Sequence, residues 1–216
     1  MKHYGLFRSS AAFRLRIALN LKGVAAEHVL VNFAKQEQFS APYRSVNPQA
    51  RVPSLVLDDG TVLIQSLAII EWLEETHPNP PLLPKDPEGR ARVRGLAHLI
   101  ACDIHPLNNI SILNYLRDKL NVPEPARNEW YRHWVAQGFE AFEALLASSR
   151  DTGRFCHGDA PGMADVCLVP QVFNAQRYEC PLGGYPTLMR VFESCMTLPT
   201  FDAAQPMKQP EAAFIK

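Results

Sequence analysis

The sequence has no surplus of charge of either sign, because 22 basic and 22 acidic side chains cancel over its 216 residues. A nucleic-acid partner is not expected, since phosphates are bound by an excess of Lys and Arg. Long hydrophobic runs are missing as well: the most apolar stretch, residues 63–73, is interrupted by polar side chains well short of the ~18 residues that a membrane span needs. Arg8 precedes any apolar region that a signal peptide would require. We therefore expect neither a membrane partner nor a leader segment.

Cysteines are few, and their spacing suggests no pairing. The chain has five, an odd number, and no C-x-x-C pair, which matches neither a disulfide framework nor the ligand spacing of a zinc site. Asp58 and Asp59 belong to an Asp-Gly turn and have no partners in view, so no metal is expected. Unpaired thiols are typical of a reducing compartment, which predicts a cytoplasmic location. The cysteines are Cys102, Cys156, Cys167, Cys180 and Cys195.

The first 80 residues alternate between strand-like and helix-like segments. Segment 10–22 carries apolar residues at i, i+4 and i+8 and ends at Gly23, which predicts an amphipathic helix with a glycine stop. Asp59-Gly60 predicts a hairpin turn, and Ser66 is placed to cap a helix that ends before Pro78. The expected order is β-α-β-α-β-β-α, with strands at 2–7, 27–32, 52–56 and 61–64, helices at 10–22 and 66–77, and a short helix or irregular turn at 33–46.

Prolines mark a boundary between two regions of the chain. Five of them fall within residues 78–87, where neither a regular helix nor a central strand can form. Beyond this segment the apolar period is helical, and long helices are expected at 90–103, 108–120, 129–149 and 163–176. The sequence thus predicts an α/β domain over residues 1–80, a Pro-rich linker over 81–87 and an all-α domain over 88–216.

Two strand-to-helix junctions offer sites for an anion. Ser9 and Ser10 stand where the first helix begins, and Gln65-Ser66 stand where the helix after the hairpin begins. Unpaired N–H groups and the helix dipole favour an anion at such a position. A serine hydroxyl there could also donate to a thiolate and hold its pKa down. A plain helix cap is the alternative for each serine.

Pro53 lies just inside an expected strand, where its missing N–H must face an edge or a bend. A cis Val52-Pro53 bond would leave the N–H and C=O of Val52 open to an extended peptide ligand, which would pair with them as a strand does. An ordinary edge-strand proline is the alternative.

In this order and on this pattern of elements, these segments resemble the zeta class of the glutathione S-transferase superfamily, which includes the maleylacetoacetate and maleylpyruvate isomerases. The resemblance covers essentially the whole chain. It implies a thioredoxin-like N-terminal domain, an all-helical C-terminal domain, a homodimer, and glutathione as the cofactor. The matching runs are residues 7–10, 14–19, 47–48, 52–53, 65–75, 82–84, 102–106 and 164–172.

The resemblance also implies the site residues. Ser9 and Ser10 would face the glutathione sulfur, while Arg8 and Arg177 would hold a dianionic substrate, because a guanidinium fork suits a carboxylate. These four are the expected catalytic residues. Surface pairing is the alternative for Arg177, and local packing is the alternative for His105, which precedes a proline. The residues expected to bind glutathione are Ser9, Ser10, Ala11, Arg14, Gln38, Val52, Pro53, Gln65, Ser66, His105, Asn109, Ile110 and Ser111.

The chain departs from the family pattern at three places. Ala11 stands where zeta members usually have a cysteine, so a mechanism that needs that thiol is excluded. Gly162 replaces the usual Ser or Thr cap of a long helix, at a small cost, and Asp165 can still accept from the Gly162 N–H. Ile110-Ser111 stand where some maleylpyruvate isomerases carry an arginine.

The function implied is a glutathione-dependent cis–trans isomerase that converts a maleyl keto-acid, maleylacetoacetate or maleylpyruvate, to its fumaryl isomer by reversible thiolate addition. Two alternatives stay open: a glutathione transferase or dehalogenase of broader substrate range, and a non-catalytic glutathione-binding protein on the same fold. Stoichiometry separates the first two, because an isomerase leaves glutathione unchanged. The expected substrate is a small dicarboxylate keto-acid.

Overall fold

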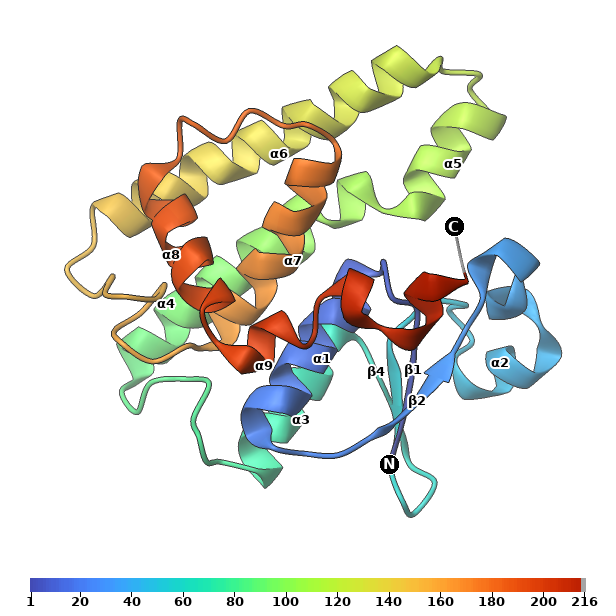
Figure 1. Ribbon diagram of the computed structural model, residues 1–216, viewed down its shortest axis with the longest axis horizontal. Helices are drawn as coiled ribbons and strands as arrows, with labels where there is room; N and C mark the ends of the chain where they lie inside the picture. The colour runs from blue at the N-terminus through green and yellow to red at the C-terminus, as the bar shows by residue number, and fades with distance from the viewer. Residues whose placement is uncertain (215–216) are drawn as a thin grey trace. The chain divides into compact units, whose positions relative to one another are not determined.

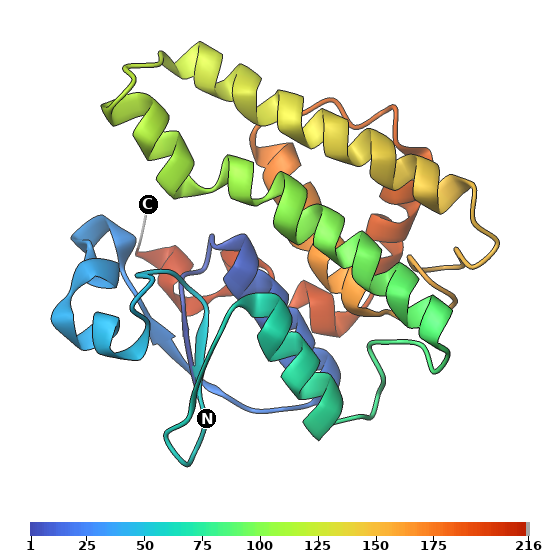
Figure 2. The same ribbon diagram turned by 180° about the vertical axis from the view of Figure 1, so that it is seen from behind.

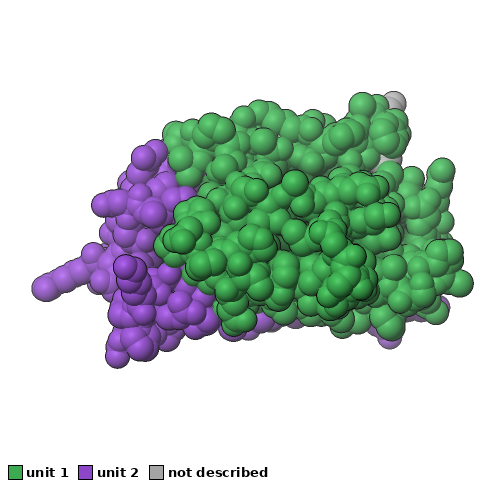
Figure 3. All heavy atoms as spheres, turned by 90° about the horizontal axis from the view of Figure 1, so that it is seen from below, with its two compact units in different colours: residues 1–82, 196–216 green, residues 83–195 purple. Residues whose placement is uncertain are grey.

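The computed structural model describes residues 1–214 (Figure 1, and from behind in Figure 2). The chain divides into two compact units, which Figure 3 distinguishes by colour. Unit 1 combines Met1–Leu82 with the segment that starts at Met196, and unit 2 is Leu83–Cys195. Every helix within the described residues is too short or too polar to span a membrane. The predicted fold class, an α/β unit followed by helices, is confirmed.

Unit 1 is built on a four-stranded mixed sheet in the order β2-β1-β3-β4. β1 pairs with β2 in parallel and with β3 in antiparallel fashion, and β4 completes a hairpin with β3. Ser54, the first residue of β3, faces Tyr4 of β1 and Ile64 of β4. This register brings the ends of β1, β2 and β4 and the start of β3 to one end of the sheet. The strands are β1 Lys2–Gly5, β2 Glu27–Leu30, β3 Ser54–Val56 and β4 Val62–Ile64.

Helices cover both faces of this sheet. α1 (Ser10–Lys22) and α3 (Ser66–Thr76) pack against each other on one side, and the short α2 (Ala41–Val46) lies on the other (Figures 1 and 2). Phe13 and Ile17 of the apolar stripe of α1 are buried and Leu21 is half-buried, while Gly23 ends the helix in the left-handed region at φ 64°, as predicted. Segment 33–46, predicted as a short helix or a turn, forms 3₁₀ turns at Phe33–Lys35 and Glu37–Phe39 before α2.

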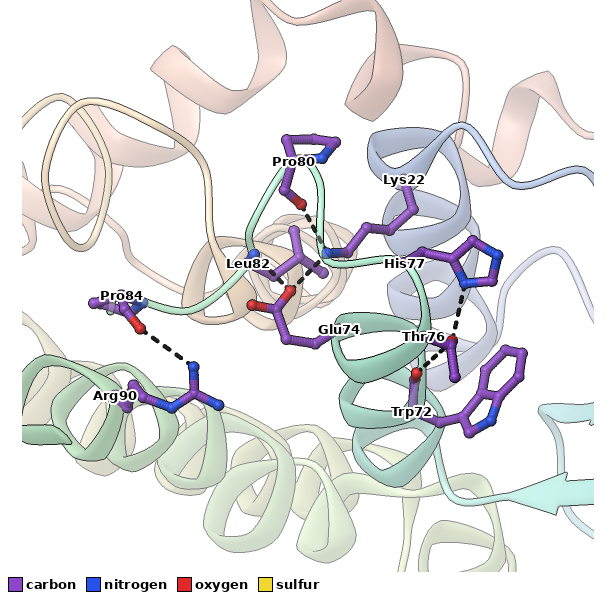
Figure 4. A network of polar contacts seen from close by, with 9 residues as sticks. All are labelled: Lys22, Trp72, Glu74, Thr76, His77, Pro80, Leu82, Pro84 and Arg90. Carbon is purple, nitrogen blue, oxygen red and sulfur yellow. Dashed lines mark hydrogen bonds and ion pairs between the residues drawn. The ribbon is translucent and has the colours of Figure 1, made fainter. Parts of the chain in front are cut away.

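A buried ion pair joins the C-terminal ends of α1 and α3 (Figure 4). Lys22 Nζ lies 2.6 Å from Glu74 Oε2 and 2.7 Å from the carbonyl oxygen of Pro80. The backbone N–H of Leu82 donates to the same carboxylate oxygen at 2.8 Å. The two side chains therefore tie both helices to the proline-rich segment that leaves unit 1.

The C-terminal segment of the chain also belongs to unit 1. It contains α9 (Pro199–Asp202) and 3₁₀ turns at Pro206–Lys208 and Pro210–Ala213. Buried Arg16 donates through Nε to the carbonyl of Ala204 and through Nη2 to the carbonyl of Phe7, both at 2.9 Å. His28 Nε2 lies 2.9 Å from Glu211 Oε1. The sequence assigned 88–216 to the helical domain, whereas the structure groups residues 196–214 with the sheet.

Unit 2 is helical and centres on α7, whose N-terminal two-thirds is buried. Asp165 accepts from the N–H groups of Gly162 at 2.8 Å and Cys156 at 2.9 Å, which confirms the predicted cap. The predicted helix 90–103 is α-helical only as far as His98 and continues as a π-helical turn, Leu99–Ile104. The helices are α4 Pro87–His98, α5 Ile110–Asp118, α6 Glu124–Ala147, α7 Met163–Arg177 and α8 Pro186–Met196, the last of which was not predicted.

Candidate functional site

The start of α1 presents a serine hydroxyl at the N-terminus of a helix. Ser9 is the N-cap, with extended backbone (φ −72°, ψ 120°), and its Oγ accepts from the N–H of Ala12 at 3.2 Å. Because Oγ acts here as an acceptor, its own proton is left for donation to another group. Ser10 is buried in the first turn, and Ala11 is half-buried beside it. The cap that was the alternative interpretation is thus present, and it is compatible with anion binding.

The bond between Val52 and Pro53 is cis, directly before β3. The N–H and C=O of Val52 make no hydrogen bond to the described residues. The preceding carbonyl, that of Arg51, is held by the hydroxyl of Tyr43 at 2.6 Å and by Asn47 Nδ2 at 2.8 Å. The loop is therefore held in place at the Arg51 carbonyl. The N–H and C=O of Val52 are the groups that an extended, strand-like ligand can pair with.

The start of α3 contains a strained residue. Gln65 has φ 70° and ψ 115°, a conformation that non-glycine residues rarely adopt. Its side-chain Nε2 donates to Gln49 Oε1 at 2.8 Å. Ser66, only 6% exposed, follows as the first residue of the helix. Such strain is retained where the surroundings impose it, commonly at ligand sites.

These three features meet at one end of the sheet, because the register places the end of β1, the start of β3 and the end of β4 side by side. β2 ends there too, and Gln38 follows it on the second 3₁₀ turn. Gln38 is 8% exposed, and its Oε1 has no hydrogen-bond partner among residues 1–214. Two helix N-termini, an open peptide unit and an orphaned amide oxygen suit a peptide-like ligand with carboxylate ends. Glutathione has this chemistry.

The arginines of unit 1 differ in their exposure. Arg8 is exposed, with its guanidinium carbon 4.9 Å from the Phe7 ring centroid. Arg14 is 2% exposed inside α1, which leaves little of it for a ligand. Arg16 is structural, since it joins the loop before Ser9, through the Phe7 carbonyl, to the C-terminal segment, through the Ala204 carbonyl, and burial lowers its pKa to about 10. Of these three, only Arg8 is exposed, and Arg44 and Arg51 of the same unit are exposed as well.

The other predicted residues belong to unit 2. His105 follows the π-helical turn and is half-buried. Asn109 is the N-cap of α5, where its Oδ1 accepts from the N–H of Ser111 at 3.0 Å and from its hydroxyl at 2.9 Å. Ile110 is exposed. Arg177 is the last residue of α7 and is exposed, with its guanidinium carbon 5.3 Å from the Tyr178 ring centroid.

Sequence reasoning missed the residues that support the site. Tyr43 and Asn47 hold the loop before Pro53, and Gln49 holds the side chain of Gln65. Asn47 was noticed only as part of a matching motif. Its spacing of four residues from Arg51 gave no sign that its amide would bind that carbonyl.

All five cysteines are free thiols, and residues 1–214 contain no group of three or more His, Cys, Asp or Glu that could hold a metal ion.

Comparison with known proteins gives matches in both units. Residues 8–76 match the family profile described as glutathione S-transferase, N-terminal domain, and residues 128–194 match that of the C-terminal domain. The chain is 49% identical to a maleylpyruvate isomerase of a Ralstonia species over 214 residues, which is 99% of this chain and 100% of the relative.

Two solved structures are also similar to this chain, and the second contains named ligands. One is a holo maleylpyruvate isomerase described as a bacterial glutathione S-transferase of the zeta class, with 48% identity, a TM-score of 0.95 and coverage of 98% and 99% of the two chains. The other is a maleylacetoacetate isomerase from Anaeromyxobacter dehalogenans, with dicarboxyethyl glutathione and citrate bound in its active site. It is 46% identical, with a TM-score of 0.87 and coverage of 98% and 96%.

Proposed function

The chain belongs to the glutathione S-transferase family, and on that premise we propose that it is a glutathione-dependent isomerase of a maleyl keto-acid. The observation that carries this proposal is the end-to-end similarity to isomerases of maleylpyruvate and maleylacetoacetate. The substrate is then maleylpyruvate or maleylacetoacetate, and the product is its fumaryl isomer.

Glutathione, when bound, supplies a thiolate that adds to the cis double bond and leaves again after rotation about the resulting single bond. The groups of unit 1 that would hold it are the start of α1, the open peptide of Val52, the amide of Gln38 and the start of α3. The Ser9 hydroxyl has a proton to donate, and the N-terminus of α1 stabilises negative charge. Both favour the ionised thiol over the neutral one and so lower its pKa.

The substrate carries two carboxylates, which call for fixed positive charge. Arg8 in unit 1 and Arg177 in unit 2 are exposed arginines with their planar forks available. A guanidinium binds a carboxylate through two parallel hydrogen bonds, which orients the substrate as well as attracting it. Ala11 brings no chemistry of its own, and the proposal needs no protein thiol at that position.

Isomerisation of both maleyl keto-acids, measured with and without glutathione, tests the proposal. Turnover is measured by the change in ultraviolet absorbance, and we expect it only when glutathione is present. The number of free thiols should be unchanged at the end of the reaction. Thiol that falls in step with product would mean a transferase instead. Glutathione binding with no turnover of either substrate would favour a non-catalytic binding protein.

We also infer a homodimer in a reducing compartment. The dimer rests on the family resemblance, and the compartment on five cysteines that are all free thiols. Light scattering should give a mass of about 48 kDa, twice the 24.2 kDa of one chain. A mass of one chain at micromolar concentration would contradict the dimer.

A further inference from the structure

Three consecutive residues of α6 contact both segments of unit 2 that carry expected substrate-side residues. Trp130 Nε1 donates to the carbonyl of Leu107 at 2.9 Å, and Asn108 Nδ2 donates to the carbonyl of Tyr131 at 3.3 Å. Leu107 and Asn108 directly precede Asn109, the cap of α5. Trp130 and Tyr131 of α6 thus hold in place the chain segment that leads into residues 109–111.

The next residue, Arg132, holds the segment that follows α7. Its Nε donates to the carbonyl of Tyr178 at 2.9 Å, and its Nη2 lies 3.3 Å from Glu179 Oε2. Glu179 itself has a left-handed backbone at φ 54°, and the N–H of Cys180 donates to the carbonyl of Ala175 at 2.9 Å. The chain therefore reverses sharply just after Arg177 and is anchored there by α6.

Between these two anchors lies an aromatic stack. The rings of Tyr131 and Tyr178 are parallel to within 9°, with centroids 3.7 Å apart, and Tyr131 is 2% exposed. The Arg177 guanidinium carbon is 5.3 Å from the Tyr178 centroid. Since the Tyr131 ring covers one face of Tyr178 at contact distance, the guanidinium has only the other face available. Tyr178 is thus backed by a buried ring and fronted by a cation.

An exposed arginine normally samples many rotamers and loses that freedom when it binds a carboxylate. A ring face restricts the guanidinium plane before the ligand arrives, which reduces the loss. We propose that Tyr178, backed by Tyr131 and anchored by Arg132, is the positioning residue that presents the Arg177 guanidinium to a substrate carboxylate. This inference rests on the proposed function, because it takes Arg177 as a carboxylate-binding group.

The test measures binding of succinate, a four-carbon dicarboxylate with no double bond to react, to the full chain saturated with glutathione. Calorimetric titration of Tyr178→Leu should give an affinity about two- to fivefold weaker than that of the parent protein, the range expected for an exposed cation–π contact. Tyr178→Phe keeps the ring face and should bind succinate as the parent does. In an Arg177→Ala background, Tyr178→Leu should cause no further loss.

An anchor variant keeps the test decisive if Tyr178→Leu fails to fold. Arg132→Gln removes the hold on the Tyr178 carbonyl while every ring stays, and it should weaken succinate binding without changing glutathione affinity. Arg190→Gln, at another exposed arginine of unit 2, is the matched control and should change neither. Melting curves check that the variants are folded.

Several outcomes would overturn the inference. These are an equal loss in Tyr178→Phe and Tyr178→Leu, a Tyr178→Leu loss that persists without the Arg177 guanidinium, or succinate affinity that does not depend on Arg177. Turnover of the maleyl keto-acids is measured on the parent protein in parallel. A lack of turnover would contradict the proposed function, while the succinate titrations would still decide whether Tyr178 positions Arg177.

Discussion

Removing the cation of the buried ion pair in unit 1 should strongly destabilise the protein. In Lys22→Met, the Glu74 carboxylate would stay 9% exposed and lose a partner at 2.6 Å, and the Pro80 carbonyl would lose a donor at 2.7 Å. The Leu82 N–H would remain on the carboxylate. Breaking a buried pair from one side costs about 3–5 kcal/mol, because the remaining buried charge has lost its counter-ion. For a chain of this size, that lowers the melting temperature by roughly 6–20 °C.

Thermal unfolding followed by circular dichroism at neutral pH measures this loss. The matched control is Lys208→Met, which breaks an exposed pair with Asp202 and should cost less than about 1 kcal/mol. A second change, Glu74→Gln, removes the buried charge that has lost its counter-ion and should restore at least half of the stability lost in Lys22→Met. Equal melting temperatures for Lys22→Met and Lys208→Met, or no recovery in the double variant, would refute the reasoning.

Three further predictions concern the site and the sheet. Ser9→Ala should raise the pKa of the bound glutathione thiol more than Ser10→Ala does, because the Ser9 hydroxyl caps α1 with its proton still available. The pKa is measured by titrating thiolate absorbance, and a larger increase in Ser10→Ala would transfer the role to Ser10. Arg177→Ala should lose turnover and keep glutathione affinity, with Arg190→Ala as the control; unchanged turnover would remove Arg177 from the site. His3 is 3% exposed, and burial, with smaller contributions from nearby cationic groups, lowers its pKa to about 3. Its folded pKa lies below the unfolded value of ~6.5, so the unfolded state gains a proton first as the pH falls, and the protein should lose about 2 kcal/mol of stability from pH 7 to pH 5. The His3→Asn variant should lose less over the same range. Equal losses of the two proteins in urea unfolding would show that His3 is not the group responsible.

Local signals explain which parts of the fold the sequence predicted. The ends of α1 follow from a serine cap and a glycine stop, and both lie within the helix's own neighbourhood in sequence. The helix predicted over 90–103 changes to a π-helical turn at Leu99, where no residue type marks the change. The bond from Arg16 to Ala204 joins residues 188 positions apart, so periodicity could not place the C-terminal segment on the sheet.

The site follows the same division. Ser9 could be placed because a strand-to-helix junction is recognisable from the pattern of apolar residues and caps. The cap predicted at Ser66 was wrong, because Gln65 is the N-cap of α3 and Ser66 is the first residue of the helix. From the sequence, a cis and a trans bond before Pro53 were both possible, and nothing in the sequence indicated the φ of 70° at Gln65. Both conformations depend on packing with residues that lie elsewhere in the chain. The role of Tyr178 likewise emerges only once α6 is beside it.

The position of the C-terminal segment in unit 1 also sets an order for folding during synthesis. Translation releases residues 1–82 long before the segment that carries Phe201, Ala204 and Glu211, all of which are buried in the finished protein. Unit 2 comes from one continuous stretch and can close its core first. The sheet unit is therefore completed last, although its strands are made first. A nascent chain stalled before residue 196 would expose the apolar surface under α9, which makes it a target for chaperones.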